Sequence, residues 1–145
     1  LDGYIHVNIQ QREPVLRVLT GEGYYVDRDG RVMPLSSKFT SRVVVATGDI
    51  NKKFACEKLG PFAMKLKNEP FWDAYIEQLV VRSNEDVVMI PKVGDFRIVL
   101  GKVDDCDARL EKLILFLKDG ITKKGWNRYK EINLKFDNQV VCVRK

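Results

Sequence analysis

The sequence predicts an α+β domain, with a mostly antiparallel sheet and one long helix and one or two short helices packed on it. Several segments alternate apolar and polar residues with the period of a strand, and Gly, Pro, Asn and Asp residues separate them. One later stretch instead spaces its leucines as an amphipathic helix does. Strands joined by short turns, with few helices, are typical of this fold class.

Composition sets broad limits on the fold and on its partners. The 145 residues, 45% of them hydrophobic, suffice for one domain with a real core. We find no membrane-spanning run and no signal peptide, and the chain opens inside an alternating pattern, so we expect a fragment whose anchor lies upstream. The net charge of +5 comes from 25 Lys and Arg against 20 intermixed Asp and Glu, which allows at most a weak preference for acidic partners.

The first third of the chain predicts strands. Alternation stops at Arg12-Glu13-Pro14, because proline cannot continue a central ladder. Asp29-Gly30 stands between two short β-prone runs, which is a strong hairpin signal. The strands expected here cover residues 4–11, 15–19, 24–27, 31–33 and 42–47.

The middle of the chain predicts short helices and then a meander. Helical spacing of Phe62 and Leu66 follows Gly60-Pro61, where proline suits a first turn, and Pro70 stops or restarts this helix. The period then returns to two, which predicts a three-stranded meander over residues 76–81, 87–90 and 96–100.

The long helix follows the meander. We expect Asp104 or Asp105 to cap it and Gly120 to end it. Its apolar stripe has the spacing i, i+3, i+4, i+7 and consists of Leu110, Leu113, Ile114 and Leu117.

The tail predicts a closing hairpin. Residues 129–136 alternate, Asp137-Asn138 is turn chemistry, and residues 140–143 are rich in valine. With nothing after it, this last strand is expected to leave one edge of the sheet uncovered. Such an edge either promotes aggregation or serves as a binding site for a strand of another chain.

No active site or metal site is predicted. Asp27-x-Asp29-Gly30 fits the hairpin better than a calcium loop, and the acidic residues around Asp104 suit a helix start. Cys106 lies in that first turn, where a thiol pKa can fall, but no His or second Cys stands nearby in sequence. The cysteines Cys56, Cys106 and Cys142 lack zinc-ligand spacing and are expected to be small buried hydrophobes. We therefore expect a non-enzyme without cofactors, unless a missing domain or second chain completes a site.

Residues 123–130 interleave basic and aromatic side chains. Such a segment can hold phosphates and stack bases, which would make the domain a basic single-stranded nucleic-acid-binding module. The preferred interpretation is that Trp126 and Tyr129 tuck onto the core while the lysines stay solvated.

Taken in order, these motifs resemble the extracytoplasmic part of the bacterial cell-division family FtsQ/DivIB. The motifs are Arg12-Glu13-Pro14-Val15, Gly23-Tyr24-Tyr25-Val26-Asp27, Val32-Met33-Pro34-Leu35, Ile76-Glu77-Gln78-Leu79, Ile90-Pro91-Lys92-Val93-Gly94, Ile98-Val99-Leu100-Gly101, Gly125-Trp126-Asn127 and Ile132-Asn133-Leu134-Lys135-Phe136.

The resemblance implies a non-catalytic divisome scaffold in the inner membrane, with one upstream membrane helix and this fragment in the periplasm. Residues 1–13 would be the last strand of a truncated POTRA domain, and residues 14–145 the β-domain. The implied partners are the septal coiled-coil proteins FtsB and FtsL, bound chiefly by the last strands. The implied partner-binding residues are Lys135, Phe136, Val140, Val141, Cys142, Val143 and Arg144. No structural disulfide is expected.

We expect a partner strand to pair with the main chain of residues 140–143, with Lys135, Arg144 and Lys145 steering an acidic segment towards it. Proline at Val141 is expected to prevent this pairing.

Overall fold

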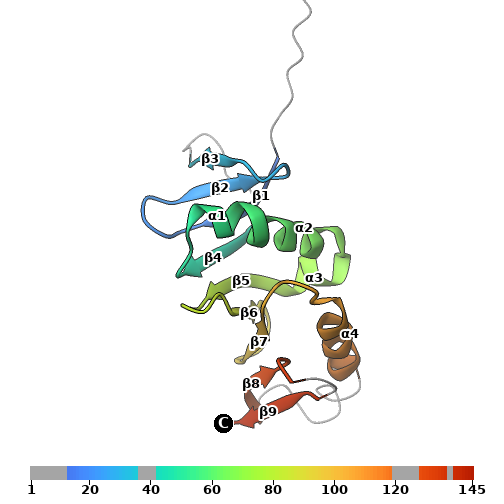
Figure 1. Cartoon of the computed structure of the whole chain (residues 1–145). Helices are drawn as coiled ribbons and strands as arrows, with labels where there is room; N and C mark the ends of the chain where they lie inside the picture. Colours follow the sequence, from blue (N-terminus) through green and yellow to red (C-terminus); the bar gives the residue numbers. More distant parts are fainter. Residues whose placement is uncertain (1–12, 36–41, 119–127, 137–138) are drawn as a thin grey trace, which may run out of the picture.

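A computed structural model describes residues 13–35, 42–118, 128–136 and 139–145. In this part of the chain the strands form one sheet in the order β3-β2-β1-β4-β5-β6-β7-β8-β9. Figure 1 shows the sheet running from β3 at one end to the red strands β8 and β9 at the other.

The strand predictions for these residues are confirmed, with boundaries that differ by up to three residues. The strands are β1 Pro14–Val18, β2 Tyr24–Asp27, β3 Val32–Pro34, β4 Val44–Gly48, β5 Ile76–Val81, β6 Val87–Pro91, β7 Arg97–Gly101, β8 Tyr129–Asn133 and β9 Val141–Arg144. The helices are α1 Lys52–Phe54, a π-helical turn η1 Ala55–Leu59, α2 Gly60–Asn68, α3 Pro70–Tyr75 and α4 Asp107–Phe116. The strand expected over residues 4–11 lies outside the described residues.

The expectation of a mostly antiparallel sheet was wrong, because the sheet is mixed. The pairs β1–β4, β4–β5 and β7–β8 are parallel. Parallel neighbours need a crossover connection, and the chain supplies helices between β4 and β5 and α4 between β7 and β8. The α+β class itself holds.

The expectation of one long helix was also wrong. Among the described residues the longest regular α-helix is α4, which has only 10 residues. Its N-cap is Cys106, without a side-chain cap, so neither Asp104 nor Asp105 caps it, and the Asp104 carboxylate pairs with Lys58 at 2.8 Å. The expected end at Gly120 lies outside the described residues. No helix in the described ranges is both long and apolar enough to cross a bilayer.

The helices and the sheet share one hydrophobic core. Leu59, Phe62 and Leu66 come from the helical segment between β4 and β5, and Leu113 comes from α4. Gly48 ends β4 with φ +107°, and a Cβ there would overlap the carbonyl oxygen of Val81 on β5. Only glycine therefore allows these two strands to come together at this point.

Candidate functional site

Strand β9 forms one end of the sheet, and its inner side is held by β8. The two strands are antiparallel, with Ile132 opposite Cys142. Ile132 and Leu134 are fully buried, so they fasten β8 to the core. Within the described residues no strand lies on the outer side of β9. Strand β9 is therefore the last strand at this end of the described sheet, where the sequence predicted an edge strand.

Hydrogen bonds on β8 show which way the main chain of β9 faces. The amide of Leu134 donates to the carbonyl oxygen of Val99 on β7 at 2.9 Å. Main-chain groups alternate between the two sides of a strand, so those of Asn133 face β9. Its partner Val141 therefore turns its own N–H and C=O inward, towards β8.

The main-chain groups at the far end of β9 follow the same alternation. The Lys145 amide donates to the Arg128 carbonyl oxygen at 3.2 Å and so also faces inward. By alternation, the main-chain groups of Cys142 and Arg144 point towards the outer edge. Near the end of β9 it is thus the main chain of Arg144 that faces away from β8.

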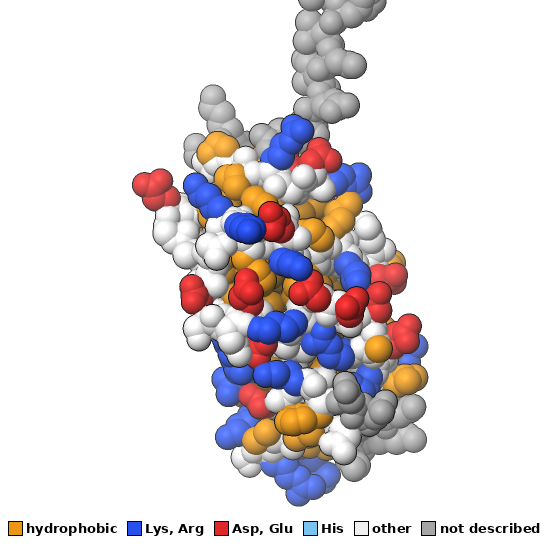
Figure 2. All heavy atoms as spheres, viewed as in Figure 1, with side chains coloured by type: hydrophobic (Ala, Val, Ile, Leu, Met, Phe, Trp, Pro, Cys, Tyr) orange, Lys and Arg blue, Asp and Glu red, His pale blue; other side chains and the backbone are white. Residues whose placement is uncertain are grey.

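The predicted site residues on β9 and just before it differ in exposure. Phe136 is 53% exposed and Val141 37% exposed, and Arg144 is also exposed. Val143 is half-buried, while Val140 and Cys142 are half-buried and pack against the core. Figure 2 shows basic and hydrophobic side chains side by side at the end of the molecule where β8 and β9 lie.

Lys135 is exposed, but its ammonium forms a salt bridge within the domain. Its ammonium lies 2.6 Å from Oδ2 of Asp86, a carboxylate that is only 2% exposed. Lys102 lies 3.4 Å from the other oxygen of Asp86, and the Asn84 amide donates to Oδ2 at 3.1 Å. Because Lys135 serves this buried anion, Arg144 and Lys130 are the cations better placed to meet a partner.

Replacing Asp86 tests this network. Burial opposes ionisation of Asp86, but the bonds and charges from Lys135 and Lys102 outweigh it, so the pKa of Asp86 lies below its ordinary value. A lowered pKa adds stability above the unfolded-state pKa, and this contribution is lost as pH falls through the folded-state pKa. Asp86→Asn is expected to lower the free energy of unfolding by about 1–3 kcal/mol at neutral pH. The difference from wild type should shrink in urea denaturation below about pH 4, and a pH-independent difference would contradict the ion-pair account.

No pattern in the sequence pointed to Lys112. From α4 its ammonium donates to the carbonyl oxygen of Phe136 at 2.7 Å and to that of Leu134 at 3.3 Å. A lysine on the polar side of a helix looks like any solvated charge in the sequence. Only the fold brings α4 beside the end of β8.

A shallow groove of about 550 Å³ lies beside the end of β9. Two ion pairs border it: the partly exposed pair of Arg97 with Glu131 at 3.1 Å, and the exposed pair of Lys145 with Asp95 at 3.2 Å. Exposed pairs of this kind contribute little to stability. Lys130 also lines the groove and forms no ion pair among the described residues.

The other residues considered for metal binding or catalysis have structural surroundings. The Asp27 carboxylate accepts hydrogen bonds from the amides of Asp29 and Arg31 at 2.9 and 2.8 Å, as a hairpin turn requires. Burial raises the pKa of the Cys106 thiol, which is the opposite of what activation would need. The cysteines form no disulfide within the described residues, which also hold no cluster of three potential metal ligands.

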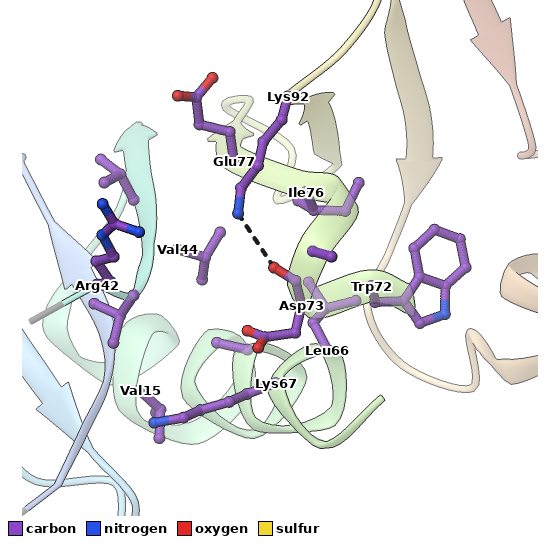
Figure 3. Close-up of a pocket in the computed structure, with 14 residues that line it drawn as sticks. Val15, Arg42, Val44, Leu66, Lys67, Trp72, Asp73, Ile76, Glu77 and Lys92 are labelled. Carbon is purple, nitrogen blue, oxygen red and sulfur yellow. Dashed lines mark hydrogen bonds between the residues drawn. The ribbon is translucent and has the colours of Figure 1, made fainter. Parts of the chain in front are cut away.

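A second hollow, of about 620 Å³, opens where β4 and β5 part. Their parallel pairing begins at Val45 and Gln78, so Val44 and Ile76 lie on opposite sides of the gap (Figure 3). Lys92 extends into it and donates to the Asp73 carbonyl oxygen at 3.4 Å. Four strands separate β4 from β9 in the sheet, so this hollow is no part of the edge.

The segment with nucleic-acid character is only partly described. Tyr129 is 8% exposed and its ring lies 6.3 Å from that of Phe116, which confirms that it tucks onto the core. A buried ring cannot stack on bases. Trp126 and the lysines before it lie outside the described residues.

Comparison with known proteins places the chain in a family. No curated protein matches it. A family model described as FtsQ/DivIB, C-terminal related, matches residues 13–143, from the start of β1 into β9. Since this match covers most of the chain and confirms the resemblance seen in its motifs, the chain belongs to the FtsQ/DivIB C-terminal related family.

Proposed function

We propose that this domain is the extracytoplasmic part of a membrane-anchored divisome scaffold and that it binds a septal partner by strand addition at β9. In this proposal residues 1–13 end a POTRA domain, residues 14–145 form the β-domain, and the anchor lies upstream in the inner membrane. The partners are coiled-coil proteins of the FtsB and FtsL kind.

Family membership supports the general role. FtsQ/DivIB proteins are non-catalytic scaffolds of cell division that act through protein interactions in the divisome. The family match includes β8 and most of β9. A scaffold needs a surface that other chains can recognise.

The observation that carries the proposal is the orientation of the main chain at the edge. Strand β9 is last in the sheet order, and the main-chain groups of Arg144 point away from β8. An added strand draws its affinity from such groups and its specificity from alternate side chains.

The side chains around the edge favour a partner that is apolar and acidic. Phe136 and Val141 offer exposed apolar surface, which an incoming strand can bury. Arg144 and Lys130 are exposed cations on the same two strands. Opposite charges on a partner would speed its association, and this gain falls with added salt.

Binding of the extracytoplasmic segments of the FtsB-like and FtsL-like proteins from the same cell tests the proposal. We expect the immobilised domain to bind at least one of them, with a slower association rate at high salt. No binding at low or moderate salt would contradict strand addition. Retention of a labelled single-stranded oligonucleotide at low salt would instead support the nucleic-acid alternative.

A further inference from the structure

We propose that Lys112 is a positioning residue for the open edge. Its ammonium fixes the main chain at the end of β8, so that β9 pairs in one register and Phe136 is displayed to the partner. The role in binding rests on the proposed function, whereas the effect on β9 itself does not.

The geometry of Lys112 is that of a clamp. An ammonium group has three donors, and two of them reach the Phe136 and Leu134 carbonyl oxygens at 2.7 and 3.3 Å. Hydrogen bonds from a charged donor are stronger than neutral ones. Helix α4 holds the lysine in place through Leu110 and Leu113, which are buried in the core.

The clamped segment needs an external tether. Strand β8 ends at Asn133, and beyond it the Leu134 side chain is buried while Phe136 is 53% exposed. The Asn133 side chain accepts a hydrogen bond from the Lys135 amide at 2.9 Å, and Asp86 holds the Lys135 ammonium. Lys112 adds the last tether, at Phe136 itself, just before the chain turns back towards β9.

Fixing this segment favours one register. Strands with exposed, weakly patterned faces are prone to slip, and a slip by one residue would turn Cys142 outward and Val141 towards the core. A partner that needs the native register binds only the fraction of molecules that present it. Lys112 therefore raises the fraction of molecules whose β9 is in the native register. It does not act through a contact with the partner.

The test is Lys112→Met, which keeps the length of the side chain and its helix propensity but removes the charge and the donors. Lys53→Met is the matched control, because Lys53 is an exposed lysine on α1. We expect faster amide hydrogen exchange over residues 141–144 in the Lys112→Met variant alone, with unchanged exchange in β5 and β6. The association rate with the partner segment should fall about three- to tenfold at a nearly unchanged dissociation rate.

Lys112→Arg keeps a charged donor and is expected to restore exchange protection and association. Unchanged exchange at β9 in the Lys112→Met variant, or exchange that rises without any loss of association, would overturn the proposal. So would a Lys112→Arg variant as impaired as the methionine variant. If the wild-type domain binds no partner segment, the proposed function fails, and the exchange comparison still decides whether Lys112 holds β9.

Discussion

Val141→Pro is expected to weaken binding of the partner segment at least about tenfold, because it loosens the strand to which the partner would pair. The Val141 amide faces β8 opposite Asn133, so proline removes a bond of the ladder that holds β9. The edge then loses its shape while the core, which Val141 does not enter, stays folded. Surface plasmon resonance with the immobilised domain measures the change, and Val141→Thr, which keeps the amide, is the control.

A second pair of variants distinguishes the pairing of β9 with β8 from the pairing of β9 with the partner strand. Arg144→Pro removes an amide that points to the outer edge, whereas Arg144→Ala removes the charge and keeps that amide. We expect a loss of up to about threefold for alanine, as for an exposed charge, and a clearly larger loss for proline. Wild-type affinity in both proline variants would contradict main-chain docking at β9.

Leu113→Ala is expected to lower the free energy of unfolding by about 2–5 kcal/mol, the usual range for a leucine removed from a packed core. Leu113 is fully buried and joins α4 to the same core as Ile98, Ile132 and Leu134. Because α4 also carries Lys112, loss of this anchor should loosen the end of β8 as well.

Leu115→Ala is the control, since Leu115 lies on the same helix and is 64% exposed. An exposed substitution of this kind should change stability by less than about 0.5 kcal/mol. Urea denaturation followed by circular dichroism measures both variants. Equal midpoints for the two would mean that α4 does not pack on the sheet as described.

Periodicity predicted the strands well because it records which residues of a segment are buried. The meander, the Asp29-Gly30 hairpin and the closing strands all follow from alternation and turn residues. Periodicity does not show which strand lies next to a given strand. The alternation of apolar and polar residues is the same beside a parallel or an antiparallel neighbour. The direction of β5 and β8 depends instead on the helical crossovers that precede them, and that of β4 on the β2–β3 hairpin that separates it from β1.

The edge strand could be predicted from the sequence, but the side-chain contacts that hold the neighbouring segment in place could not. The order of strands at the end of the chain suggested an edge strand, and family resemblance gave it a role. Lys112 and Phe136 are 24 residues apart, and Asp86 and Lys135 are 49 apart, so no local pattern connects them. Lys135 is an example. The sequence predicted that it contacts a partner, and the structure shows that its ammonium also pairs with the buried carboxylate of Asp86.

The two end strands of the described sheet, β3 and β9, differ in length and composition. Strand β3, at the end opposite β9, has only three residues and finishes with Pro34, which has no amide hydrogen to offer. Copies of the domain that stacked β9 onto β3 would form an open-ended filament, and the short proline-ended strand opposes that growth. If β9 accepts a partner strand as proposed, β3 at the opposite end of the sheet is the poorer acceptor, and addition of one strand would not start a chain of further additions.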